Sequence, residues 1–118
     1  MELYEYTAHE LAGLLREKRA SAKEITQSVF QRIRAVEGLV DAYISLSEES
    51  ALEQAAAVDE KIAKGEPLAP LAGIPVAVKD NICIQGGATT CASRMLADYE
   101  SVYTATCVQR MLDAGCLP

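Results

Sequence analysis

The sequence predicts an α/β fold in which a mixed β-sheet is covered by helices. Apolar residues recur at helical spacing in four segments, and two shorter segments have the length and apolar character of strands. The expected helices cover residues 7–18, 21–36, 48–64 and 104–114, and the expected strands cover residues 41–46 and 74–79. A helix between consecutive strands is typical of α/β proteins, and 118 residues suffice for one domain. We therefore expect a single domain.

The first two helices are predicted from capping boxes. Thr7 and Ser21 each precede a glutamate by three residues, so hydroxyl and carboxylate can satisfy free N–H groups at the helix start. Ile25 and Ile33 then share one face of the second helix, which indicates an amphipathic helix packed on a core. This helix is expected to end near Gly38.

The third helix is predicted from an alanine-rich run, Ser50 to Ala63, flanked by suitable charges. Glu48 stands where a helix start favours negative charge, and Lys61 stands where a helix end favours positive charge. Gly65 is a natural residue to follow the last turn, and Pro67 prevents the helix from continuing.

The last part of the chain is predicted to be turns followed by a helix. Thr104 is expected to cap that helix, with Val108 and Met111 facing inward and Gly115 ending it. A further short helix is expected over residues 92–97.

The strand at residues 74–79 has unusual charge patterning. It is apolar on both faces, as in a central strand of a covered sheet, and Pro75 suggests that pairing begins after it. Between Pro67 and Ser93 the only charged residues are Lys79 and Asp80. We therefore take Lys79, at the end of this strand, as the main candidate functional residue.

Lys79 has two interpretations. The end of a central strand is where ligands bind in α/β sheets, and desolvation there would favour a neutral amine able to act as a base. Alternatively, Lys79 emerges into solvent or pairs with Asp80. Because adjacent strand residues point to opposite faces, Asp80 is a poor partner while the strand persists.

Three other candidates have simpler structural interpretations. Gly86 and Gly87 lack the spacing of known phosphate-binding loops, so a turn is favoured. His9 has no acid or thiol partner nearby and is expected on an exposed helix surface. Ser93 would need a base and an oxyanion hole to act as a nucleophile, and the sequence offers neither in an obvious place.

Composition excludes several classes of function. With 11 basic and 17 acidic residues, a net charge of −6 and no basic cluster, direct nucleic-acid binding is not expected. The start resembles no signal peptide, and no apolar run is long enough for a membrane span, so a cytoplasmic protein is expected. The cysteines lack zinc-site spacing, so free thiols and no bound metal are expected. They are Cys83, Cys91, Cys107 and Cys116.

Two segments resemble the amidase signature family. They are Leu71–Ile82, which reads LAGIPVAVKDNI, and Thr89–Leu96, which reads TTCASRML. The second segment is similar to the amidotransferase A subunits within that family, and the resemblance extends over essentially the whole chain. It implies amide hydrolysis by a Ser–cis-Ser–Lys triad, with Lys79 as the triad lysine.

The resemblance implies that this chain is only the N-terminal segment of an amidase domain. Neither Ser93 nor Ser101 matches a triad serine, and the Gly/Ser-rich region that carries both serines is not among these residues. Because loss of triad members removes most catalysis, we expect the chain alone to be inactive.

For the intact subunit, the resemblance implies glutamine hydrolysis, with ammonia passing to a partner B subunit. That subunit would use ATP and Mg²⁺, a small C subunit would hold the two together, and tRNA would bind through the complex. No cofactor is implied in this chain itself. Two alternatives stay open: a related amidase acting on another small amide, and a non-catalytic interaction domain.

Overall fold

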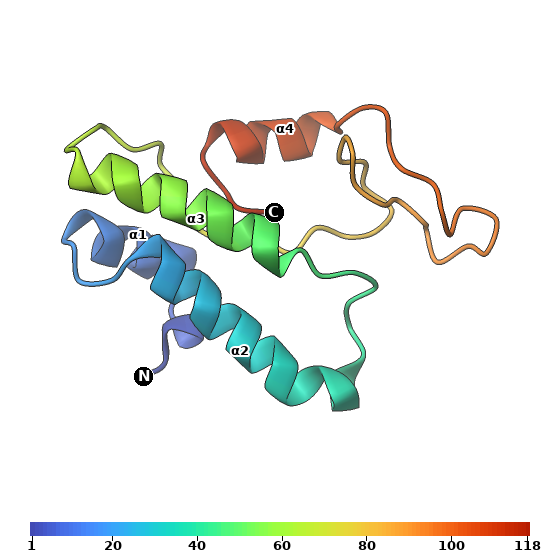
Figure 1. Cartoon of the computed structure of the whole chain (residues 1–118), viewed down its shortest axis with the longest axis horizontal. Coiled ribbons are helices and arrows are strands. Elements are labelled where there is room, and N and C mark those ends of the chain that lie inside the picture. Colours follow the sequence, from blue (N-terminus) through green and yellow to red (C-terminus); the bar gives the residue numbers. More distant parts are fainter.

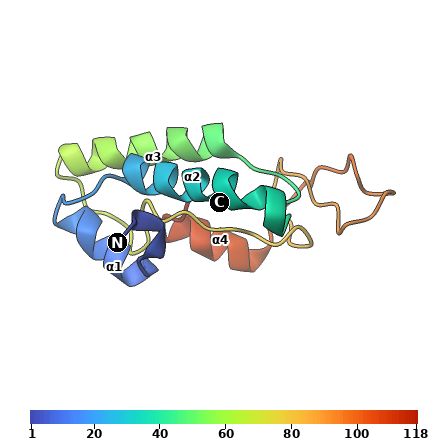
Figure 2. The same cartoon turned by 90° about the horizontal axis from the view of Figure 1, so that it is seen from below.

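The computed structural model describes all 118 residues, and its regular elements are helices. They are a 3₁₀ helix, η1 (Leu3–Glu5), and four α-helices: α1 (Ala8–Arg16), α2 (Ala22–Val40), α3 (Glu48–Ala63) and α4 (Thr106–Asp113). Helices α2 and α3 lie side by side, and α1 and α4 lie on one side of this pair (Figures 1 and 2). The chain between α3 and α4 forms loops, which first pass along the helices and then extend to one side (Figure 1). No helix is long and apolar enough to span a membrane.

The predicted capping boxes are present at both α1 and α2. The Thr7 hydroxyl accepts the Glu10 N–H at 3.2 Å, and the Glu10 carboxylate accepts the Thr7 N–H at 2.8 Å. Ser21 and Glu24 make the same exchange at 3.1 and 2.9 Å. Helix α2 runs past Gly38, however, and ends at Val40, where Asp41 adopts a left-handed conformation with φ 51°.

Helix α3 ends as predicted, with Gly65 in the left-handed region at φ 73°. The Gly65 N–H donates to the Ile62 carbonyl at 3.1 Å, and the Glu66 N–H donates to the Lys61 carbonyl at 3.0 Å. These two bonds form a Schellman motif, which satisfies carbonyls at the helix end.

A side chain of helix α3 also caps the N-terminal end of α2. The Asp59 carboxylate accepts the Ala22 N–H at 2.7 Å and the Lys23 N–H at 3.1 Å. A carboxylate at a helix start satisfies free donors and complements the positive end of the helix dipole. Asp59 thus fixes the start of α2 against the C-terminal half of α3.

The main hydrophobic core joins the first three helices to two distant segments. Its buried residues are Leu11, Leu15, Ala22, Ile25, Ala55, Ile74 and Leu117. A smaller cluster of Phe30, Ile33 and Ala51 joins α2 to α3. Burial of a large aliphatic side chain contributes roughly 1.5–3 kcal/mol. Ile74 and Leu117 therefore attach the second half of the chain to the helices.

The two expected strands are not formed as strands. Residues 41–46 are irregular, with Ile44 and Leu46 exposed. Residues 74–79 contain one parallel bridge, between Pro75 and Leu117. A strand forms only where a neighbouring segment hydrogen-bonds to its N–H and C=O groups. No neighbouring segment pairs with these residues beyond Val76.

The observed pairing includes Pro75 and does not begin after it. The Leu117 N–H donates to the Ile74 carbonyl at 2.8 Å, and the Val76 N–H donates to the Leu117 carbonyl at 2.7 Å. Pro75 lies between these two bonds, at a position whose nitrogen is not needed as a donor. The expectation that proline would delay pairing was wrong because only alternate N–H groups of a parallel strand face one neighbour.

Helix α4 differs from the prediction at its start. It begins at Thr106, and its N-cap is Ala105, which provides no side-chain cap. The Thr104 hydroxyl instead accepts the Gln85 N–H at 2.9 Å. Val108 is buried and Gly115, at φ 96°, follows the helix end, both as predicted. Residues 92–97 form turns, not the expected helix.

We predict that Gly73→Ala lowers the free energy of unfolding by about 1–3 kcal/mol. Gly73 has φ +80°, and a Cβ there would lie 2.9 Å from the Ala22 Cβ. Urea unfolding followed by circular dichroism measures the change. Gly38→Ala is the matched control, because a Cβ added at this position in α2 would have no heavy atom within 4 Å, and it should gain up to about 1 kcal/mol. Equal losses in both variants would contradict the close approach at Gly73.

We also predict that Asp59→Ala destabilises the chain by about 1 kcal/mol, because two N–H groups of α2 lose their acceptor. Glu60→Ala serves as the control, since that neighbouring carboxylate is exposed and has no hydrogen bond in the structure. The same unfolding measurement applies. A loss in Glu60→Ala as large as in Asp59→Ala would show that the effect is general charge removal.

Candidate functional site

Lys79 lies just beyond the paired residues 74–76, where the chain leaves the helices. Its side chain is exposed and forms neither of the two salt bridges in the structure. Of the two interpretations of Lys79, this structure has the side chain in solvent, because no neighbouring strand covers the chain after Val76. Lys79 follows Val76, the last paired residue, by three positions.

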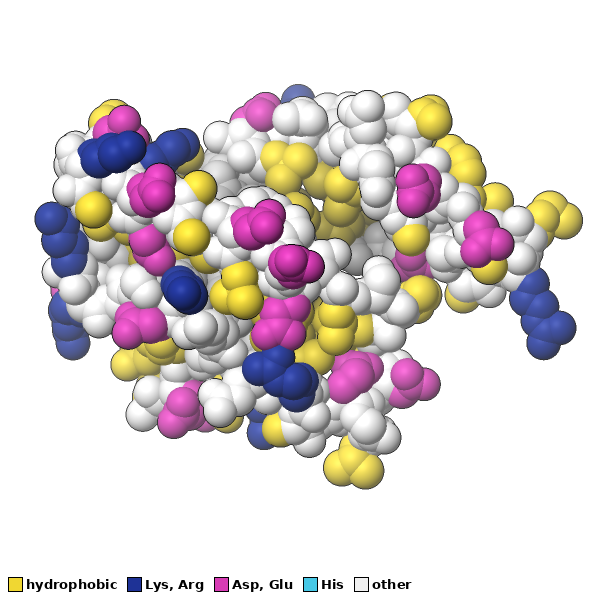
Figure 3. Space-filling view, viewed as in Figure 1, with side chains coloured by type: hydrophobic (Ala, Val, Ile, Leu, Met, Phe, Trp, Pro, Cys, Tyr) yellow, Lys and Arg dark blue, Asp and Glu magenta, His cyan; other side chains and the backbone are white.

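Lys79 lines an open hollow of about 1210 Å³. One wall comes from α2 and α3, a second from the connection at residues 42–47, and a third from residues 75–88. Most of the lining side chains are hydrophobic, and Figure 3 shows hydrophobic side chains around a gap in the middle of the molecule. Lys79 thus contributes an amine to the lining of a mainly apolar hollow.

Asp80 is anchored by a loop and not by Lys79. Its carboxylate accepts the Thr90 N–H at 3.1 Å and also the Thr90 hydroxyl. Hydrogen bonding from the Thr90 hydroxyl is the largest effect and lowers the pKa of Asp80. Desolvation opposes it, and the N–H groups of Thr90, Ala92 and Cys91 lower the pKa further. The carboxylate is therefore held ionised and fixes the chain immediately after Lys79.

The loop that holds Asp80 has an unusual backbone. Cys91 and Ala92 both lie in the left-handed region, with φ 51° and 55°. Such conformations cost about 1 kcal/mol or more for residues other than glycine. Sequence reasoning missed the Asp80–Thr90 contact because ten residues separate the two, and nothing in their spacing indicates that they meet.

The other candidates are not brought to Lys79. The Ser93 hydroxyl accepts the Met95 N–H at 3.2 Å, and the buried Ser101 hydroxyl donates to the Tyr103 carbonyl at 2.6 Å. Gly86 and Gly87 form a turn bonded to Ser101, as favoured from the sequence. His9 is exposed. No group of three His, Cys, Asp or Glu side chains lies close enough together to hold a metal ion.

Comparison with known proteins gives consistent results. The amidase family model matches residues 24–118. The A subunit of the glutamyl-tRNA(Gln) amidotransferase of Moorella thermoacetica is 54% identical over 98% of this chain and 24% of its own length. The corresponding A subunit from Desulforamulus reducens is 48% identical over 97% of this chain. The chain spans about a quarter of the length of these curated relatives.

Solved structures agree on the fold. A bacterial aryl acylamidase of the amidase signature family superposes with a TM-score of 0.90 at 27% identity, covering 98% of this chain and 24% of that enzyme. The peptide amidase of Stenotrophomonas maltophilia gives a TM-score of 0.86 at 31% identity, covering 96% of this chain and 23% of that enzyme. The predicted fold class is confirmed as part of a larger fold. The chain belongs to the amidase signature family.

Proposed function

We propose that this chain is the N-terminal, lysine-bearing part of the glutaminase (A) subunit of a glutamyl-tRNA(Gln) amidotransferase. The observation that carries the proposal is 54% identity to a protein of that name across nearly the whole chain. The solved amidases named above are only 27–31% identical. The sequence identity is therefore higher to the amidotransferase subunits than to the aryl acylamidase or the peptide amidase.

The proposed reaction of the whole subunit is hydrolysis of glutamine to glutamate and ammonia. The ammonia would pass to a B subunit, which uses ATP and Mg²⁺ to convert Glu-tRNA(Gln) to Gln-tRNA(Gln), with a C subunit joining the two in the cytoplasm. The net charge of −6 supports this division, because tRNA would be bound elsewhere in the complex.

Lys79 would act as the base of the Ser–cis-Ser–Lys triad. Its amine would take a proton from the bridging serine, which in turn would deprotonate the nucleophilic serine. Two features of the structure support this role. The Lys79 side chain has no partner that would have to be displaced, and the anchored Asp80 fixes the adjacent backbone. Both triad serines must come from residues outside these 118, so the chain alone would be inactive.

A hydrolase of another small amide is the second candidate. It is favoured by the superposition on the peptide amidase, with 31% identity and a TM-score of 0.86. The two candidates share the role of Lys79 and differ in the amide that is cleaved. They are separated by substrate and by whether the product ammonia reaches tRNA-bound glutamate.

The test is a chimera in which this chain replaces the matching quarter of the Moorella thermoacetica A subunit, co-expressed with that organism's B and C subunits. We expect glutamine-dependent formation of Gln-tRNA(Gln), measured together with glutamate release. Lys79→Ala should lower kcat for glutamine hydrolysis by about a thousandfold or more, because triad members act as a unit. Lys64→Ala, at an exposed lysine after α3, should leave kcat within about twofold.

The two candidate functions predict different results for the chimera. A folded chimera that cleaves peptide amides but not glutamine would favour the second candidate. The 118-residue chain alone should release no ammonia from glutamine above buffer. Steady release that disappears in Lys79→Ala would show that the chain carries a complete catalytic unit, contrary to the proposal.

A further inference from the structure

The hollow beside Lys79 contains two opposite charges that do not pair. Lys79 and Asp80 have the only charged side chains that line it, so each is the only side chain there with which the other could form an ion pair. The two residues are also neighbours in the chain. Neither of the two salt bridges in the structure involves them, however. The Asp80 carboxylate is therefore held by something other than the Lys79 amine.

The backbone alone does not keep the two side chains apart. Adjacent residues of a strand point to opposite faces, but pairing with a neighbouring segment stops at Val76. Residues 77–79 are irregular, and a turn follows in which the Ile82 N–H donates to the Lys79 carbonyl at 2.9 Å. The alternation of a strand therefore gives no reason for Asp80 to avoid Lys79.

Thr90 provides the contact that holds the Asp80 carboxylate. Its N–H donates to the carboxylate at 3.1 Å, and its hydroxyl group donates as well. The Thr90 hydroxyl oxygen accepts the Ala92 N–H at 3.3 Å, an arrangement that leaves its single proton for Asp80. Because Thr90 is buried, with 8% of its surface exposed, water competes little for these groups.

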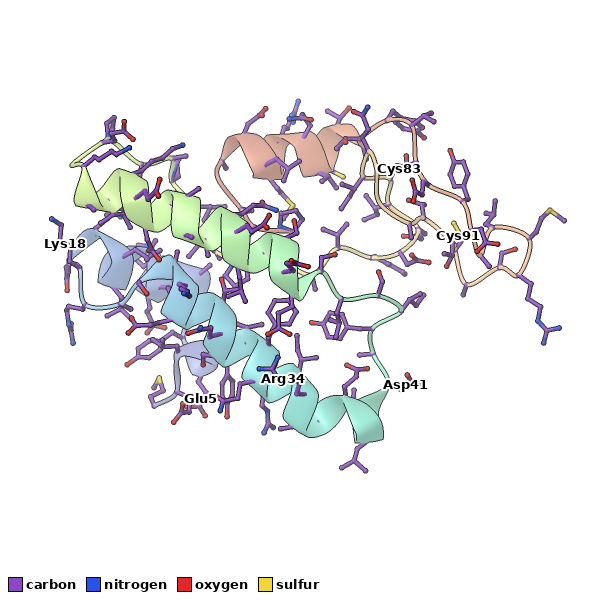
Figure 4. The ribbon with its side chains drawn as sticks, viewed as in Figure 1. Glu5, Lys18, Arg34, Asp41, Cys83 and Cys91 are labelled. Atoms are coloured by element: carbon purple, nitrogen blue, oxygen red, sulfur yellow. The ribbon has the colours of Figure 1, made fainter.

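The backbone after Thr90 is folded in a way that supports this contact. Cys91 and Ala92 both adopt left-handed conformations, with φ 51° and 55°, which residues other than glycine rarely do. They turn the chain so that the Ser93 N–H donates to the Thr90 carbonyl at 2.8 Å. Figure 4 shows Cys91 in the loops beyond the helices, so this turn, and not a helix, positions Thr90.

We propose that Thr90 is a positioning residue for the base Lys79, and that it acts by holding the Asp80 carboxylate away from the Lys79 amine. This inference rests on the proposed function, in which the amine takes a proton from the bridging serine. Only a neutral amine can accept a proton, and a carboxylate paired with it favours the charged form. With the carboxylate bound to Thr90, the amine is free to lose its proton and to contact that serine.

A purely structural role for Thr90 makes a different prediction. Loss of a loop contact that only stabilises the fold would lower activity by the same factor at every pH. Release of the Asp80 carboxylate would instead move the acidic limb of the kcat/KM profile to higher pH, because the amine would keep its proton longer.

The surroundings of Lys79 allow this shift to be assigned to Asp80. Helices α2 and α3 contribute no titratable side chain to the hollow, and the loops contribute only Tyr43 and Cys91 besides Lys79 and Asp80. Pro118 also lines the hollow, and in the chimera its carboxyl group is part of a peptide bond. Asp80 is therefore the one carboxylate that can move toward the amine.

The experiment measures glutamine hydrolysis by the chimera with its B and C subunits across a range of pH. Thr90→Val removes the hydroxyl donor, and we expect the acidic limb of kcat/KM to move up by about 0.5 pH unit or more. Thr90→Ser keeps the hydroxyl and should retain the original profile. In Asp80→Asn no carboxylate is present, so adding Thr90→Val to it should cause no upward shift. Thr104→Val is the matched control, because the Thr104 hydroxyl holds a different loop N–H, that of Gln85, and its profile should be unchanged.

A second measurement needs no variant and no activity. In the unmutated 118-residue chain, the NMR signals of the Lys79 ε-methylene group should not change as the Asp80 carboxylate titrates. Signals that follow the Asp80 titration would show that the two groups pair, and would overturn the proposal.

The remaining outcomes separate this proposal from the proposed function. A Thr90→Val chimera that loses activity equally at every pH, or a double variant with the same upward shift, would make Thr90 only structural while leaving Lys79 as the base. Full glutamine hydrolysis in Lys79→Ala would refute the role of Lys79 itself, and positioning by Thr90 with it.

Discussion

The pairing of residues 71–76 with residues 114–117 is the contact on which the rest of the structure depends. It places Ile74 and Leu117 together in the core formed by α1, α2 and α3. The two backbones approach so closely that a Cβ at Gly115 would lie 2.7 Å from the Ala72 Cα. Glycine is required there for space as well as for its φ of 96°. Without this pairing, nothing in the main core would attach the second half of the chain.

The same pairing explains how the backbone at Lys79 is held in place although its side chain is exposed. The chain is fixed at Val76 by its bond to Leu117 and fixed again at Asp80 by Thr90. Lys79 therefore lies on a short segment that is held at both ends, so its backbone loses little further freedom when other residues approach. Its exposed side chain keeps its rotamer freedom and forms neither of the two salt bridges in the structure. Such a lysine is ready to be ordered by groups that enter the hollow.

The sequence predicts features set by neighbouring residues and misses those set by distant ones. The capping boxes and the Gly65 helix end involve residues within five positions of each other, and all of them are present. The bond from Gln85 to Thr104 spans 19 residues, and it removed the cap expected for α4. The strand at residues 74–79 was limited for the same reason, because an apolar run becomes a strand only where a partner lies alongside.

Lys79 and Asp80 are neighbours in the sequence, but their partners lie in different places. The groups that hold Asp80, the N–H and the hydroxyl of Thr90, lie within this chain and are already placed beside it. Lys79 has no such partners, and its proposed role needs serines that these 118 residues do not supply. The fixed position of Asp80 is therefore a property of these residues themselves. Catalysis by Lys79, as proposed above, would be a property of the larger amidase fold.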